Sequence, residues 1–287
     1  MSCRIIQSLD QIAHAYDVIL CDLWGCYHNG IDYYAAAATA CQQFRQRGGL
    51  VVLLTNAPRP AASVETLLAG MKAPRDSWDL IVSSGGACQS AVADGSFGNA
   101  FIYVGPERDV HMLTDLGKHP VAADGADAVL LTGLRDDRVE TPDEYSNEIA
   151  DWVTRGLPVL CANPDIIVDR GETRLWCAGA IAQRVEEAGG QVVWFGKPHA
   201  PIYDRCRAEV ALARGGPVAD ARILAIGDGI LTDVPGGLAA GFDVVFVTGG
   251  LSSTQFGSDV ENPEQAPLDT FLAANGLAPK FAIGRLR

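Results

Sequence analysis

Residues 18–25 read VILCDLWG, four apolar residues that stop at an acid. A short apolar run without polar alternation is typical of a strand buried on both faces, as in a parallel sheet. The chain is therefore predicted to build its core on buried parallel strands. Comparable runs, bounded by Gly, Pro, Asn or Asp, occur at residues 50–54, 80–83, 128–131, 159–161, 192–195, 223–226 and 244–247.

Segments with the composition of helices separate these runs. Alternation of strand and helix predicts an α/β fold with a doubly wound, mostly parallel, Rossmann-like sheet and right-handed crossovers. No internal repeat and no low-complexity linker interrupts the pattern. The predicted helices lie at residues 34–47, 61–71, 142–155, 179–188 and 201–213.

Composition narrows the class of protein. The chain has 287 residues, 48% of them hydrophobic, which is enough apolar surface for a full core. Its 22 basic and 35 acidic residues give a net charge of −13 without any basic run, so we expect no nucleic-acid partner. No stretch approaches the about 18 apolar residues of a membrane helix, and no secretory signal is recognisable, so we expect a cytoplasmic protein with no membrane partner. The eight cysteines include no C-x-x-C pair, which disfavours a zinc site.

Polar residues follow four of the predicted strands directly. In open parallel sheets, ligands bind beyond the carboxyl ends of the strands, so these residues are expected to face the same end of the sheet. They comprise acids, one lysine and a hydroxyl–amide pair. The residues are Asp22, Thr55, Asn56, Lys197 and Asp228, with Asp233 one helical turn after Asp228.

This set of side chains is suited to phosphoryl transfer through an aspartyl-phosphate. Mg²⁺ prefers oxygen ligands and is usually held by one or two carboxylates, so Asp22 and Asp228 could bridge the ion to a phosphate. Lys197 would neutralise charge on the nucleophile and on the transferred group. Thr55 and Asn56 would donate hydrogen bonds to the phosphoryl oxygens. The sequence therefore predicts a catalytic pair, Asp22 and Lys197, beside a phosphate site.

The order and spacing of these segments resemble the haloacid-dehalogenase-like hydrolase superfamily, in its class IIA phosphatase branch with a C2-type cap. The resemblance covers almost the whole chain. It is carried by DLWG at 22–25, LLTN at 53–56, CANPD at 161–165, GKP at 196–198 and GDGILTD at 227–233.

The resemblance implies two domains. Residues 1–84 and 191–287 would form the hydrolase core, and residues 85–190 an inserted α/β cap that covers the site and selects the substrate. Closure of such a cap expels water and completes the site.

Site roles carry over from the resemblance residue by residue. Asp22 would be the nucleophile and a metal ligand, Asp228 a second metal ligand and Asp233 a supporting carboxylate of the metal site. The remaining protein ligand would be the main-chain carbonyl of Trp24, which does not depend on the side chain.

Trp24 is also the departure from the family pattern. A second aspartate usually stands there and acts as general acid and base, a contribution of about 10²–10⁴ in rate. Three interpretations follow. In the first, the substrate has a good leaving group. In the second, another group takes over as acid and base, and His28 is the nearest titratable candidate. In the third, the chain binds a phosphorylated ligand without turnover.

The first hypothesis is therefore a Mg²⁺-dependent phosphatase-like hydrolase of a small phosphorylated metabolite, such as a sugar or nucleotide phosphate. The alternative is a binding or regulatory protein with little turnover. A displacement at carbon, such as on a carbon–halogen bond, is disfavoured because it needs no metal site. The sequence leaves the substrate and homo-oligomerisation open.

Overall fold

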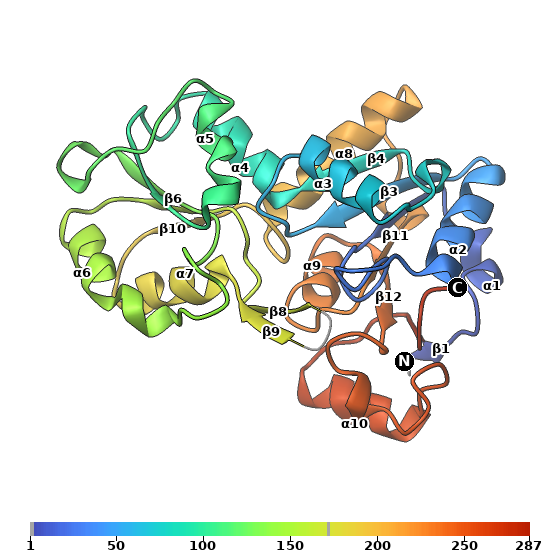
Figure 1. Ribbon diagram of the computed structural model, residues 1–287. Coiled ribbons are helices and arrows are strands. Elements are labelled where there is room, and N and C mark those ends of the chain that lie inside the picture. The colour runs from blue at the N-terminus through green and yellow to red at the C-terminus, as the bar shows by residue number, and fades with distance from the viewer. Residues whose placement is uncertain (1–2, 171–172) are drawn as a thin grey trace. The chain divides into compact units, whose positions relative to one another are not determined.

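The computed structural model describes residues 3–170 and 173–287 of the chain (Figure 1). Contacts within the chain divide it into two compact units. Unit 1 comprises Met1–Thr55, Glu65–Val82 and Tyr203–Arg287, and unit 2 comprises Asn56–Val64 and Ser83–Ile202. The predicted core and cap have other boundaries, and that division stays a prediction.

Unit 1 is an α/β unit around one sheet. Its strands are β1 (Arg4–Ile5), β2 (Val18–Cys21), β3 (Leu50–Thr55), β4 (Leu80–Ser83), β11 (Ile223–Gly227), β12 (Asp243–Val247) and β13 (Phe281–Ile283). Its helices are α1 (Asp10–Ala13), α2 (Ala35–Gln46), α9 (Asp233–Ala239) and α10 (Gln265–Ala274), together with most of α3 (Ala61–Gly70) and α8 (Ala200–Arg214).

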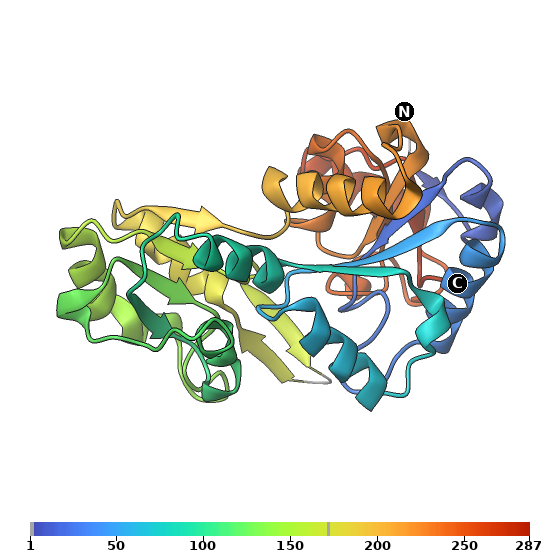
Figure 2. The same cartoon turned by 90° about the horizontal axis from the view of Figure 1, so that it is seen from above.

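The sheet of unit 1, here called the large sheet, has seven strands among the described residues, in the order β1-β13-β12-β11-β2-β3-β4. From β1 to β3 each strand is parallel to its neighbour. All four residues of β2 and all six of β3 are buried, because both strands lie inside the sheet and helices cover both of its faces. Figure 2 shows α8 on one face and α3 on the other. This is the doubly wound arrangement that the sequence predicts.

Unit 2 is built around a second parallel sheet. Its strands are β5 (Phe101–Val104), β6 (Ala128–Leu131), β7 (Val159–Cys161) and β10 (Val192–Trp194), and an antiparallel pair, β8 (Ile167–Arg170) with β9 (Thr173–Trp176). Its helices are α4 (Ser84–Ala93), α5 (His111–Thr114), α6 (Ser146–Thr154) and α7 (Ala178–Glu187).

The small sheet, as we call it, has the order β10-β7-β6-β5 within the described part of the chain. Alternate residues of its strands enter two different apolar clusters. Val129 and Leu131 of β6 pack with Trp152 of α6 and Ile181 of α7, whereas Leu130 packs on the other side with residues of α4 and α5. A sheet covered on both faces explains why its strands read as continuous apolar runs in the sequence.

The predicted fold class is confirmed, with one correction to the strand assignment. Residues 192–195 were expected to join the sheet that carries Asp22, but β10 pairs with β7 in the small sheet. The apolar run identifies a buried parallel strand, yet nothing in four residues specifies which sheet it joins. None of the helices in the described ranges is long and apolar enough to span a membrane.

Candidate active site

The two acids predicted as metal ligands lie at the ends of neighbouring strands in unit 1. Strands β2 and β11 are parallel with Cys21 opposite Ile226, and the Asp22 N–H donates to the Ile226 carbonyl at 2.8 Å. Asp228 directly follows β11. The two residues are only 7% (Asp22) and 4% (Asp228) exposed, although both are acids. The large sheet therefore places two buried carboxylates at its carboxyl edge.

These carboxylates form a cluster with a thiol. One ligand atom each from Asp22, Asp228 and Cys26 all lie within 4.8 Å of one another. Cys26 carries no local signal in the sequence, because Asp228 comes from a distant segment and no C-x-x-C or similar spacing marks the cysteine. Two carboxylates at this distance repel by about 3 kcal/mol at an effective dielectric of about 20, which favours a cation between them.

Two glycines shape the surroundings of Asp228. A Cβ on Gly25, which has φ of +76°, would lie 2.2 Å from Asp228 Oδ2, and one on Gly250 would lie 1.9 Å from the same atom. The Leu251 N–H also donates to this oxygen at 2.9 Å. Side chains at the two glycines would displace the carboxylate, so the local backbone creates the space that Asp228 occupies.

Asp233 organises the loop that carries Asp228. It is the first residue of α9, and its Oδ2 accepts hydrogen bonds from the Gly229 N–H at 3.1 Å and from the Thr232 hydroxyl at 3.3 Å. Among the described residues it lies outside the cluster formed by Asp22, Cys26 and Asp228. These contacts fit a supporting carboxylate, and its place in a metal site stays a prediction.

Thr55 is the last residue of β3, the strand on the other side of β2. Because Cys21 pairs with Leu53, Thr55 lies two residues beyond that register at the same edge of the large sheet as Asp22. Its side chain is buried. Three of the four predicted strand ends are therefore brought to one edge of one sheet.

The loop after Asp22 folds back on itself around Trp24. The indole packs edge-on against the His28 ring, with 5.0 Å between ring centroids, and against Gly30. A Cβ on Gly30, which has φ of +85°, would lie 2.3 Å from the indole. The Gly25 N–H donates to the His28 carbonyl at 2.9 Å and closes the loop. Trp24 is thus held in a fixed orientation.

His28, the predicted substitute acid or base, is fully buried. Its Nδ1 accepts a hydrogen bond from the Gly30 N–H at 3.0 Å, so in the neutral ring the proton lies on Nε2. Nε2 has no hydrogen-bond partner among the described residues. Burial lowers the pKa of His28 to about 4, so the ring is neutral at pH 7. These contacts do not favour proton transfer by His28, and that role stays a prediction.

Lys197 and Asn56, the other predicted phosphate ligands, belong to unit 2. The Lys197 N–H donates to Asn56 Oδ1 at 2.8 Å, and Asn56 Nδ2 donates to the Lys197 carbonyl at 3.1 Å and to Asp165 Oδ1 at 2.8 Å. The Asn56 amide thus clamps the main chain of Lys197, whose side chain is buried. Asp165, the last residue of the CANPD segment, thus orients the Asn56 amide.

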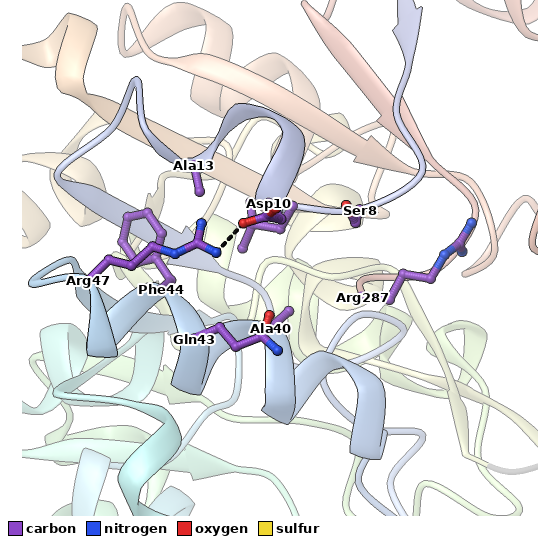
Figure 3. Close-up of a pocket in the computed structure, with 9 residues that line it drawn as sticks. Ser8, Asp10, Ala13, Ala40, Gln43, Phe44, Arg47 and Arg287 are labelled. Carbon is purple, nitrogen blue, oxygen red and sulfur yellow. Dashed lines mark ion pairs between the residues drawn. The ribbon is translucent and has the colours of Figure 1, made fainter.

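Unit 1 also contains a cavity of about 30 Å³ between α1 and α2 (Figure 3). Asp10 and Arg47 form an ion pair there. The other guanidinium group lining it, that of Arg287, is bonded to Glu261 and Gln7. With both cations engaged and none of the predicted site residues among its lining, the cavity is not a second candidate for an anion.

The fold and the site define a doubly wound α/β protein with two buried acids after adjacent parallel strands, at the edge where such sheets bind their ligands. Comparison with known proteins gives the family. A family model described as haloacid dehalogenase-like hydrolase matches residues 19–119, and one described as HAD-hydrolase-like matches residues 194–274. A crystal structure of a haloacid dehalogenase-like hydrolase from Brucella suis 1330 has 36% identity and a TM-score of 0.86, covering 99% of this chain and 100% of that one. The chain belongs to the haloacid dehalogenase-like hydrolase family.

More distant structures share the fold. A possible sugar phosphatase from Cytophaga hutchinsonii has 19% identity and a TM-score of 0.74, with both chains covered completely. A glycerol phosphate phosphatase from Mycobacterium tuberculosis, in complex with magnesium, has 24% identity and a TM-score of 0.62, covering 84% of this chain and 71% of that one. No curated protein matches the sequence significantly. The superfamily predicted from the sequence motifs is confirmed, and the protein is a hydrolase.

Proposed function

We propose that the protein is a magnesium-dependent phosphatase that hydrolyses a small phosphorylated metabolite through an aspartyl-phosphate on Asp22. The observation that carries the proposal is the buried pair of carboxylates, Asp22 and Asp228, with oxygen atoms within 4.8 Å of each other at the edge of the large sheet. An arrangement of this kind offers both a nucleophile and a cation site.

The donor set fits Mg²⁺, which takes carboxylate and carbonyl oxygens and retains several waters. Asp22 and Asp228 would hold the ion, with the Trp24 carbonyl as a third protein ligand and Asp233 in support. Cys26 is a soft donor and a poor ligand for this ion, so we assign it no role in holding Mg²⁺. When bound, the ion would neutralise charge on the phosphoryl oxygens and draw electron density from phosphorus.

The chain's own residues would perform the remaining steps. An oxygen of Asp22 attacks phosphorus, and the bond from phosphorus to the leaving oxygen breaks. Water then attacks the aspartyl-phosphate and releases inorganic phosphate. We assign the ammonium group of Lys197 to charge neutralisation, Thr55 to the phosphoryl oxygens, and Asn56 to phosphate binding and to holding the Lys197 main chain.

The substrate class is proposed from the family and from the structural neighbours. The neighbours include a possible sugar phosphatase and a glycerol phosphate phosphatase, which supports a small phosphorylated metabolite such as a sugar or nucleotide phosphate. We further propose that residues 85–190 act as the domain that selects the substrate, with residues 1–84 and 191–287 as the hydrolase core.

The test is hydrolysis of p-nitrophenyl phosphate with and without Mg²⁺. We expect Mg²⁺-dependent turnover that falls by about 10⁴-fold or more in Asp22→Asn, since the nucleophile is removed. The matched control is Asp17→Asn, at the opposite end of β2. Asp17 forms a half-exposed ion pair with Arg222, so this variant is expected to keep its activity and lose at most about 1 kcal/mol of stability.

The same assay separates the phosphatase from the alternative of a binding protein. Absence of Mg²⁺-dependent turnover, with calorimetric binding of Mg²⁺ and phosphate retained, would reject the phosphatase and support binding without catalysis. Equal loss in Asp17→Asn would show that the effect of Asp22→Asn comes from folding and would remove the assignment of the nucleophile.

A further inference from the structure

Trp24 is fixed immediately beside the candidate nucleophile and metal site. It is bonded to Gly25, whose missing side chain leaves room for Asp228, and its indole is packed between His28 and Gly30. The residue is partly exposed. A rigid indole therefore occupies the position two residues after the reacting carboxylate.

The loop that contains Trp24 offers no carboxylic acid or ammonium group that could give a proton to a departing oxygen, and its one thiol, that of Cys26, is buried and only a weak hydrogen-bond donor. Residues 23–30 include no Asp, Glu, Lys or Arg. Tyr27 is fully buried, and its hydroxyl is hydrogen-bonded to Ser77 at 2.6 Å. The Nδ1 atom of His28 is occupied by the Gly30 N–H. The indole N–H of Trp24 is a hydrogen-bond donor only and does not ionise near neutral pH.

We propose that Trp24 restricts the enzyme to phosphates whose leaving oxygen departs as a stable anion, namely acyl phosphates, phosphoanhydrides, and aryl or enol phosphates. The proposal rests on the phosphatase function proposed above and narrows its substrate class. Esters of simple alcohols need a proton on the leaving oxygen, a contribution that is worth about 10²–10⁴ in rate.

The two steps balance without a protein acid. In the first, an Asp22 oxygen bonds to phosphorus while the bond to the leaving oxygen breaks, and the electron pair stays on that oxygen as an anion. In the second, water bonds to phosphorus and the bond to Asp22 breaks, which restores the carboxylate. The protons of the attacking water end on inorganic phosphate and in solvent.

The experiment measures kcat/KM for a series of phenyl phosphates with substituents that change only the acidity of the phenol, together with benzyl and glycerol phosphates. For the wild-type protein we expect a steep fall in rate as the phenol becomes less acidic. The two alkyl phosphates should be slower than p-nitrophenyl phosphate by at least about 10²-fold.

Two substitutions test Trp24 itself. Trp24→Asp supplies a carboxylic acid at this position, and we expect a shallower dependence on leaving-group acidity with alkyl phosphates gaining about 10²-fold relative to p-nitrophenyl phosphate. Trp24→Phe keeps an aromatic side chain without an acid and should keep the steep dependence, whatever its absolute rate. Thermal unfolding of both variants checks that they fold.

The outcomes separate this inference from the proposed function. A flat dependence in the wild-type protein, with turnover intact, would show that another group donates the proton and would overturn the role of Trp24 alone, even if neither variant folds. Absence of turnover and of Asp22 phosphorylation with every substrate, acetyl phosphate included, would instead overturn the phosphatase. Intact mass after mixing with acetyl phosphate reports the phosphorylation independently of turnover.

Discussion

The carboxyl edges of the large and small sheets carry side chains of opposite charge, although the two sheets are built alike. Both sheets are parallel and buried on two faces. The large sheet ends in Asp22 and Asp228, whereas β10 of the small sheet leads, after two residues, to Lys197. Parallel topology thus provides an edge where side chains collect, and the few residues after each strand decide their charge.

The two edges also differ in how the charged residue is held. In unit 1 a main-chain N–H, that of Leu251, holds the side chain of Asp228. In unit 2 a side-chain amide, that of Asn56, holds the main chain of Lys197. The acidic edge should therefore be sensitive to changes of backbone space, and the basic edge to the loss of side-chain hydrogen bonds.

Among the variants that compare the two edges, the largest loss of activity is expected from adding one methyl group at the acidic edge. In Gly25→Ala the new Cβ would lie 2.2 Å from Asp228 Oδ2, so the carboxylate must move out of the cluster with Asp22. We expect at least about a 10²-fold loss of kcat/KM, about 3 kcal/mol, and weaker Mg²⁺ binding by calorimetry. Hydrolysis of p-nitrophenyl phosphate provides the activity measurement.

Gly48→Ala is the matched control for this substitution. Gly48 has φ of +85°, close to the +76° of Gly25, but nothing lies within 4 Å of its added Cβ. Both variants should lose about 1 kcal/mol of stability from the unfavourable backbone conformation. If Gly48→Ala loses as much Mg²⁺ affinity as Gly25→Ala, backbone strain is responsible and the space around Asp228 is not.

A smaller effect is expected from the basic edge. Asp165→Ala removes the acceptor that fixes the Asn56 amide, so the main chain at Lys197 is less well held. We expect kcat to fall about tenfold, roughly 1.4 kcal/mol, with KM and the melting temperature little changed. Steady-state kinetics on p-nitrophenyl phosphate separate the two constants.

Further variants define this positioning role. Asp165→Asn retains an acceptor oxygen and should restore most of the rate, and Asp169→Ala, which breaks an exposed ion pair with Arg174 in the same segment, should leave kcat unchanged. In the double variant with Asn56→Ala, the effects should be less than additive by about 0.5–3 kcal/mol. Full additivity would mean that Asp165 does not act through Asn56.

The sequence predicts the parts of the molecule that short segments determine. The run at 128–131 becomes β6 with the same bounds, because a buried parallel strand is recognisable from consecutive apolar residues alone. Strand β5 is absent from the predicted runs, and the sheet that β10 joins was assigned wrongly. Pairing depends on packing between distant segments, and a four-residue window carries no information about it.

The same distinction applies to the candidate site. Asp22 was identified because it directly follows an apolar run, and Asp228 because only a single Gly separates it from one. Cys26 lies in the same cluster, yet its partners are one residue nearby and one about 200 positions away, and no local pattern records such an encounter. The orientation of Asn56 by Asp165 was missed for the same reason, since the two residues are 109 positions apart.

The last comparison concerns stability and takes one histidine from each unit at acidic pH. Burial alone lowers the pKa of His28 to about 4. Burial also lowers the pKa of His199 of unit 2, which is half-buried and stacked on Trp194, but the charge of Glu186 partly offsets this shift. Below pH 6.5 the unfolded chain takes up a proton at His28 that the folded chain takes up only near pH 4, so falling pH destabilises the fold across this window. At pH 5 this amounts to about 2 kcal/mol.

His28→Asn keeps an acceptor for the Gly30 N–H but does not titrate. Between pH 7 and pH 5, the free energy of unfolding of this variant, measured with denaturant, should therefore fall by about 2 kcal/mol less than that of the wild type. His199→Asn should change this loss of stability by less. Parallel pH profiles of stability for wild type and His28→Asn would mean that His28 can be protonated in the folded protein. The assignment of a neutral, buried imidazole packed against Trp24 would then be wrong.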